Sequence, residues 1–281
     1  MNPLKLYKTK SGIIIDIDDS YYLVTGQDWD TYINDDELYS KVFNAVKGLK
    51  TDAGLRKIIE TGLLAPIQSQ EIWACGVTYY RSKVGRQEES KNTGGSEFYA
   101  RVYEAERPEI FFKATASRTV GPYEKVRIRK DSTWDVPEPE LTLVVTSSGK
   151  IVGYTVGNDL SSRSIEGENP LYLPQAKTYD GSAAIGPCIY VTEEPLPEDT
   201  FIRMQILRGG AVMFEGEVAI NQIKRKFPDL VSYVYKETSF PHGCLVMTGT
   251  GIVPSSDFTL KKDDTIRITI QNIGTLENTV G

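Results

Sequence analysis

The sequence predicts a mixed α/β protein that is mainly β. From Ile110 onward, short alternating or β-branched segments are separated by turn signals such as Gly209-Gly210 and Lys262-Asp263-Asp264. Apolar residues at helical spacing occur mostly in the first hundred or so positions. The chain has 281 residues, 40% of them hydrophobic, which is enough for a sizeable core.

A small α+β domain is expected over residues 1–68, followed by a larger domain over residues 69–281. The first domain should contain strands at Leu4–Lys8, Gly12–Ile17 and Tyr21–Val24, and two helices that include Leu38 to Val46 and Leu55 to Gly62. Asp35 is the candidate cap of the first helix.

The second domain should be built mostly of strands. We expect them at Ile72–Cys75, Val126–Arg129, Leu141–Val145, Ile151–Val156, Phe201–Leu207, Ala211–Phe214 and Thr265–Gln271. Phe98, Tyr99, Val102 and Tyr103 indicate a helix that ends before Pro108. Residues 84–96 are polar and Gly-rich, which fits an exposed loop and equally a lid that closes over a site.

Composition excludes several classes of function. The net charge of −6 argues against a nucleic-acid partner, which favours a basic face. The sequence has no apolar run of the roughly 18 residues that a membrane span needs. Cys75, Cys188 and Cys244 are far apart and form no CxxC pair, which indicates reduced thiols in a cytoplasmic protein.

His242 is the single histidine, and it lies between Pro241 and Gly243. A Ser-His-Asp triad or a His-rich zinc site would depend on this one residue, whose neighbours are typical of a loop. A bound metal would therefore need oxygen ligands, which favours Mg²⁺, Mn²⁺ or Ca²⁺ over Zn²⁺.

Glu138, Glu140 and Asp159 could supply those oxygens. The two glutamates are two residues apart, so on a strand they point to the same face. Ser148-Gly149 is a credible two-residue hairpin turn. If Ser147 pairs with Lys150, Glu138 stands opposite Asp159, and three carboxylates share one end of the hairpin. They would repel one another unless a cation lies among them.

Pro139 suits a strand end or a sheet edge. At an edge, Glu138 and Glu140 could instead be charges that discourage aggregation.

Two further segments, at Lys177 and at Thr248–Gly251, could contribute to a metal site. Lys177 is either a surface lysine or an ammonium beside a divalent ion. Thr248-Gly-Thr-Gly251 is either a tight turn or a cradle of N–H groups and a hydroxyl for a carboxylate.

The chain resembles the fumarylacetoacetate hydrolase superfamily in several motifs taken together. They are Gly76-Val-Thr-Tyr-Tyr80, Glu138-Pro-Glu140-Leu141, Gly157-Asn-Asp159-Leu-Ser-Ser-Arg163, Ala176-Lys-Thr-Tyr-Asp180, Ile185-Gly-Pro187, Thr248-Gly-Thr-Gly251 and Ile273-Gly-Thr-Leu-Glu-Asn278. The resemblance implies a β-roll or β-sandwich catalytic domain that assembles as a dimer or tetramer. It also implies that Glu138, Glu140 and Asp159 bind Mg²⁺ or Mn²⁺, that Lys177 lies beside the substrate, and that Thr250 holds its carboxylate.

The sequence departs from the hydrolases of this superfamily. Tyr79-Tyr-Arg81-Ser82 lacks the histidine that helps to activate water, and Glu166 replaces a frequent glutamine. Arg81-Ser82 and Trp134-Asp-Val-Pro-Glu-Pro-Glu-Leu141 instead resemble an archaeal dehydratase branch. That resemblance implies Mg²⁺-dependent dehydration of 2-keto-3-deoxy-D-arabinonate to 2,5-dioxopentanoate through a metal-stabilised enolate. An acylpyruvate hydrolase, a 2-oxoacid decarboxylase, an isomerase and a non-catalytic binding relative are the alternatives.

Each candidate residue has an expected role in such a reaction. Lys177 is the candidate base at C3. Glu109 could act as the acid or position water, or be a surface carboxylate. Arg81 and Ser82 are candidates for contacts to the substrate's hydroxyl and carboxylate groups, and Thr250 for the carboxylate. The expected partner is therefore a small 2-keto sugar acid.

Overall fold

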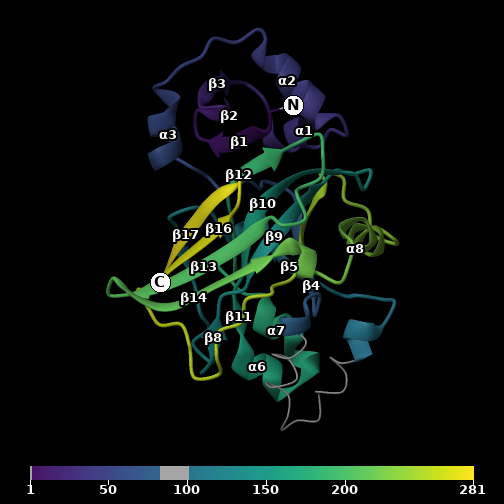
Figure 1. Cartoon of the computed structure of the whole chain (residues 1–281), viewed down its shortest axis with the longest axis vertical. Helices are drawn as coiled ribbons and strands as arrows, with labels where there is room; N and C mark the ends of the chain where they lie inside the picture. The colour runs from purple at the N-terminus through teal and green to yellow at the C-terminus, as the bar shows by residue number, and fades with distance from the viewer. Residues whose placement is uncertain (1, 83–100) are drawn as a thin grey trace.

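The computed structural model describes residues 2–82 and 101–281, and a ten-stranded mixed sheet forms its centre. The strand order is β3-β2-β1-β12-β10-β9-β15-β4-β5, with β6 beside β12 (Figure 1). These strands are β1 (Leu4–Thr9), β2 (Gly12–Ile17), β3 (Ser20–Val24), β4 (Glu71–Gly76), β5 (Glu109–Thr115), β6 (Thr119–Val120), β9 (Pro139–Val145), β10 (Ile151–Asp159), β12 (Ala183–Val191) and β15 (Cys244–Met247).

A five-stranded sheet packs against one face of the first, and apolar side chains of both fill the space between them. Its strands are β14 (Ala211–Ala219), β13 (Phe201–Arg208), β16 (Thr265–Ile270), β17 (Gly274–Val280) and β7 (Lys125–Val126), in that order. Leu141 and Val156 of the large sheet share this core with Ile268 of β16. The arrangement confirms the predicted mainly β fold.

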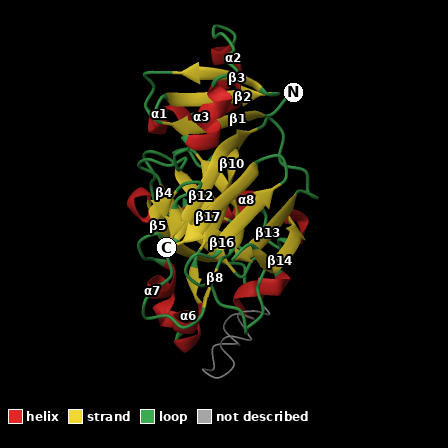
Figure 2. Cartoon of the chain, turned by 90° about the vertical axis from the view of Figure 1, so that its left-hand side faces the viewer, coloured by secondary structure: helices red, strands yellow, loops and turns green. Residues whose placement is uncertain are grey.

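Five of the labelled helices lie at the two ends of the molecule (Figure 2). The N-terminal end carries α1 (Trp29–Ile33), α2 (Leu38–Val46) and α3 (Leu55–Thr61), and the opposite end carries α6 (Arg163–Glu168) and α7 (Leu173–Lys177) beside the short ladder of β8 (Asp135–Val136) and β11 (Ser161–Ser162). Helix α8 (Phe227–Val234) flanks the sheets. Within the described ranges, no helix is long and apolar enough to cross a membrane.

The N-terminal strands continue the large sheet, because β1 pairs antiparallel with β12. The three predicted strands and two predicted helices of this region are confirmed, while the domain boundary near residue 68 stays a prediction. The cap of α2 is Glu37 and not Asp35, whose carboxylate accepts instead from the Glu37 N–H. The expected lid at 84–96 and the start of the helix at Phe98 lie outside the described residues.

The predicted two-residue turn of the β9–β10 hairpin is wrong. Thr146, not Ser147, pairs with Lys150, and the loop holds three residues that end in Gly149 at φ +86°. A bulge between Ile151 and Gly153 then shifts the register by one residue. The two differences cancel, so the predicted pairing at the far end is correct.

Glu138 therefore stands opposite Asp159, whose N–H donates to the Glu138 carbonyl at 2.9 Å. Pro139 begins β9, as the strand-end interpretation requires. The edge interpretation is wrong, since β9 lies between β10 and β15 in the interior of the sheet. These glutamates do not protect a sheet edge.

Candidate metal centre

Three carboxylates meet where β9 and β10 end. Glu138 directly precedes β9, Glu140 is its second residue, and Asp159 is the last residue of β10. One carboxylate oxygen from each lies within 4.8 Å of the others. All three residues are buried, with exposed fractions of 5% or less. The sheet's hydrogen bonds thus hold the backbone at a point where buried negative charges converge.

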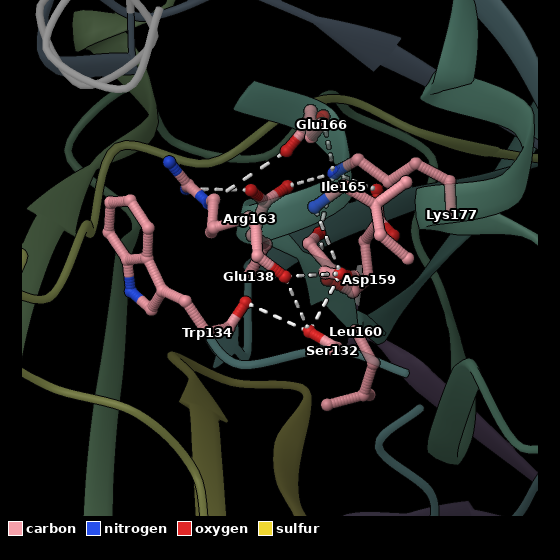
Figure 3. Close-up of polar contacts among 12 residues, drawn as sticks. Ser132, Trp134, Glu138, Asp159, Leu160, Arg163, Ile165, Glu166 and Lys177 are labelled. Atoms are coloured by element: carbon pink, nitrogen blue, oxygen red, sulfur yellow. Dashed lines mark hydrogen bonds and ion pairs between the residues drawn. The ribbon is translucent and has the colours of Figure 1, made fainter. Parts of the chain in front are cut away.

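Two cations from α6 and α7 hold Glu138 from either side (Figure 3). Lys177, the last residue of α7, donates from Nζ to Glu138 Oε2 at 2.7 Å, to Asp159 Oδ2 at 3.1 Å and to Ser161 Oγ at 2.6 Å. Arg163, the first residue of α6, donates from Nη2 to Glu138 Oε1 at 2.8 Å. The interpretation of Lys177 as a surface lysine is wrong, because its side chain is fully buried.

Lys113 of β5 is a second fully buried lysine, which the sequence analysis did not single out. Its Nζ lies 2.5 Å from Asp159 Oδ1 and 3.0 Å from the Leu160 carbonyl oxygen. Burial alone would raise the pKa of Asp159, but Lys113 and Lys177 together outweigh burial and hold that pKa below its ordinary value. Asp159 is therefore charged and held at both oxygens.

Glu140 has the opposite environment. Burial and the charges of Asp159 and Glu138 raise its pKa well above the ordinary value. The Gly249 N–H donates to Glu140 Oε2 at 2.5 Å, so the glycine-rich segment does bind a carboxylate, one of the protein's own. The raised pKa reflects repulsion that a cation would relieve. Three clustered carboxylates are the donor set of a hard divalent ion, so the residues present fit Mg²⁺.

Glu166 of α6 adds a fourth buried carboxylate. It lies 3.9 Å from Lys177 Nζ and 4.0 Å from Arg163 Nε. Among the described residues, four carboxylates (Glu138, Glu140, Asp159, Glu166) face three cations (Lys113, Arg163, Lys177), which gives one net negative charge when all seven groups are ionised. A divalent ion would reverse that charge and favour an anionic ligand.

The cavity at this centre contains some of the other candidate residues. Ser82 and Thr250 line it with Gly76 and Phe111. The Ser82 hydroxyl donates to the Tyr79 carbonyl at 2.7 Å. The Thr250 hydroxyl donates to the Ile252 carbonyl at 3.2 Å. Both hydroxyls therefore hold local backbone, and a ligand would have to share them.

Glu109 and Arg81 differ in their position. Glu109 begins β5 opposite Gly76, where an added Cβ would lie 2.1 Å from Glu109 Oε2. The glycine thus leaves room for the carboxylate beside a residue that lines the cavity. Arg81 is exposed and is not among the described residues that line the cavity. His242 is also exposed, on a loop.

Two relatives of this chain at more than 40% identity are named as dehydratases. The chain is 49% identical over 216 residues to a Haloferax volcanii protein named probable 2-keto-3-deoxyxylonate dehydratase, covering 76% of this chain and 73% of that protein. It is 44% identical over 222 residues to the 2-dehydro-3-deoxy-D-arabinonate dehydratase of Saccharolobus solfataricus, covering 78% and 74%.

Solved structures show the same relationship over the whole chain. A 2-keto-3-deoxy-D-arabinonate dehydratase complexed with magnesium and 2,5-dioxopentanoate superimposes with a TM-score of 0.82 at 35% identity, covering 100% of this chain and 98% of that one. Its apo form gives a TM-score of 0.83 with the same identity and coverage. The family model for the C-terminal domain of fumarylacetoacetate hydrolase matches residues 78–281. The chain therefore belongs to the fumarylacetoacetate hydrolase family.

Proposed function

We propose that this protein is a magnesium-dependent hydro-lyase that converts 2-keto-3-deoxy-D-arabinonate to 2,5-dioxopentanoate and water. The observation that carries the proposal is the buried carboxylate trio with Lys177 hydrogen-bonded to two of its members. Relatives at 44–49% identity are named as dehydratases of such acids. The structural neighbour with magnesium and 2,5-dioxopentanoate supports both the cofactor and the product.

Glu138, Glu140 and Asp159 would hold the metal ion. A divalent ion there would act as a Lewis acid on the 2-keto group of the substrate and so lower the pKa of the proton at C3. Mn²⁺ and Ca²⁺ also take carboxylate oxygens, so they are the expected substitutes. The positive charge that results would favour binding of the substrate's carboxylate.

Dehydration requires a base near C3 and an acid near the C4 oxygen. A proton leaves C3, and hydroxide leaves C4 and takes up a proton as water. C5 then loses a proton and C3 regains one, which moves the C3–C4 double bond to C4–C5. The enol formed there becomes the C5 aldehyde, so all five carbons stay in the product. No histidine is needed for these steps.

Lys177 is the proposed base, because its Nζ reaches the cavity beside the carboxylates that would hold the metal. An amine that donates to three oxygens is an ammonium, so it would have to give up a proton, as a nearby metal ion favours, before it accepts one from C3. Glu109 is proposed to act as the acid or to position the departing water, from its place beside Gly76. Ser82 and Thr250 are proposed to contact the substrate from the cavity wall. Arg81 is proposed to contact it from the surface near Ser82.

The function is tested by incubating the purified protein with Mg²⁺ and a panel of 2-keto-3-deoxy acids and acylpyruvates, then identifying the products by mass. The expected product is the substrate less one water, with the carbon chain intact. Shorter carbon chains would show hydrolysis or decarboxylation and refute the proposal, and an unchanged mass with new connectivity would show an isomerase.

The role of Lys177 has its own test. Lys177→Met should stop exchange of the substrate's C3 proton with deuterated solvent, which nuclear magnetic resonance follows directly. Lys130→Met, at an exposed lysine, is the matched control and should exchange at the normal rate. Normal exchange in Lys177→Met would remove Lys177 as the base.

Self-association and location are also proposals. A dimer or tetramer is proposed from the family resemblance, and light scattering coupled to gel filtration measures the mass. A cytoplasmic location is proposed because Cys75, Cys188 and Cys244 are all buried and unpaired with one another. Fractionation of the source cells would test this location.

A further inference from the structure

Lys113 has contacts that the proposed dehydration does not use. Its Nζ meets three oxygens: Asp159 Oδ1 at 2.5 Å, the Leu160 carbonyl at 3.0 Å and the Lys177 carbonyl at 2.5 Å. The two carbonyls accept hydrogen bonds from the ammonium, and the carboxylate oxygen forms an ion pair with it. A lysine is almost never fully buried unless it is paired, so this one has a defined place in the site.

The backbone of β5 is deformed at this residue. Ile72 stands opposite Ala114, and Trp73 stands opposite Phe112, so Lys113 is the extra residue of a β-bulge. Bulges occur beside active sites, where they redirect a side chain. Phe111 and Ala114 contact the same apolar cluster on the carboxylate side of the sheet, and the bulge adds Lys113 between them.

The three acceptors belong to two different parts of the site. Asp159 and Leu160 lie at the end of β10, which carries a candidate metal ligand. Lys177 ends α7, and carbonyls at a helix carboxyl end lack helical partners and favour a cation. One ammonium therefore joins the metal-binding strand end to the helix that carries the proposed base.

The same contact divides the two oxygens of Asp159. Oδ1 faces Lys113 while Oδ2 faces Lys177. The Oδ2 contact is the longer of the two, at 3.1 Å against 2.5 Å, so a metal ion would reach Asp159 through Oδ2 and share or displace Lys177 there. The orientation of this ligand is thus set before any ion arrives.

We propose that Lys113 is a positioning residue that holds Asp159 and the carboxyl end of α7 at a fixed separation. It thereby sets the orientation of a metal ligand and the distance from the metal-binding carboxylates to the Lys177 amine. The part that concerns Lys177 rests on the proposed function, whereas the part that concerns Asp159 needs only the metal. Each part therefore has its own measurement.

The first measurement is the Mg²⁺ affinity of Lys113→Met, determined by isothermal titration calorimetry without substrate. Loss of an outer-sphere partner typically weakens metal binding by about 10–100-fold, and that is the expected rise in Kd. If the lysine merely supplied positive charge, its removal would tighten Mg²⁺ binding. An unchanged or lower Kd would overturn the proposal.

The second measurement is turnover by the same variant. Because the base would be displaced from C3 while the cavity wall is intact, kcat should fall about 10–100-fold and KM should stay within about threefold. A rise in KM with kcat retained would refute the link to Lys177.

Ile268→Ala is the matched control, since Ile268 is a fully buried residue of the other sheet. It should lower the melting temperature and leave both Kd and KM unchanged. Weakened Mg²⁺ binding in this control would show that destabilisation alone explains the Lys113 result.

If Lys113→Met does not fold, the wild-type protein crystallised with Mg²⁺ decides the question. Lys113 Nζ should still contact Asp159, and Asp159 should bind the ion through one oxygen. Two oxygens on the ion, or a displaced Lys113, would overturn the proposal. Failure of the wild type on every 2-keto acid, with Mg²⁺ binding weakened in the variant, would refute the proposed function alone.

Discussion

Replacement of Asp135 by asparagine should stabilise the protein, and the gain should depend on pH. Asp135 begins β8 and is 4% exposed. Its Oδ1 has no hydrogen-bond partner within the part of the chain that the structure describes. Burial raises the pKa of this carboxyl from 3.8 to about 6. The charged form is therefore less favourable in the folded than in the unfolded protein.

The size and sign of the effect follow from that pKa. A rise from 3.8 to about 6, at about 1.4 kcal/mol for each tenfold change in proton affinity, corresponds to about 3 kcal/mol. Since the folded state binds this proton more tightly, the penalty is absent well below pH 3.8 and grows as the pH rises. It is about 0.6 kcal/mol at pH 4 and nearly complete above pH 7.

Urea unfolding of both proteins at pH 4 and pH 7.5 measures the difference. The free energy of unfolding of Asp135→Asn relative to wild type should increase between these two conditions by about 2.4 kcal/mol. Asp199→Asn, at an exposed position, is the control and should change little with pH. A difference for Asp135→Asn that is independent of pH would refute the reasoning.

Three further predictions concern the metal centre. Because burial and neighbouring charges raise the pKa of Glu140, protons compete with Mg²⁺, so calorimetry should show affinity that rises with pH; constant affinity between pH 5.5 and pH 8 would contradict this. Chelation should lower the melting temperature and added Mg²⁺ should restore it, because only the folded site binds the ion; a scan insensitive to both would argue against the site. Gly76→Ala places a Cβ 2.1 Å from Glu109 Oε2, so the displaced carboxylate should lower kcat by about 100-fold without changing Mg²⁺ affinity; full turnover would remove Glu109 from the mechanism.

The carboxylate trio could be predicted because it depends on short-range rules. Alternation along a strand puts Glu138 and Glu140 on one face, and antiparallel pairing puts Asp159 opposite Glu138. The turn was predicted wrongly because sequence does not show a three-residue loop and a bulge that compensate for each other. The prediction survived because only the sum of the two shifts matters at the far end.

The cations of the site could not be placed in the same way. Lys113 comes from β5, and its approach to Asp159 requires the order of strands in the sheet and the bulge at that residue. A lysine within the apolar run of Ile110 to Ala114 was the available signal, since a charge there needs a buried partner. Arg163 and Glu166 stood in or beside a recognised motif, but their contacts depend on how α6 folds back over the hairpin end.

The compensating bulge at Val152 separates the two ends of the β9–β10 hairpin. The solvent end absorbs a one-residue change in loop length, and the carboxylate end retains its alignment. Evolution could therefore lengthen or shorten this loop, for instance to reshape a surface, without a matching change in the catalytic residues. Loop length at residues 147–149 should vary among homologues more freely than anything between Glu138 and Leu143, and a laboratory insertion there should be tolerated if a second bulge can form.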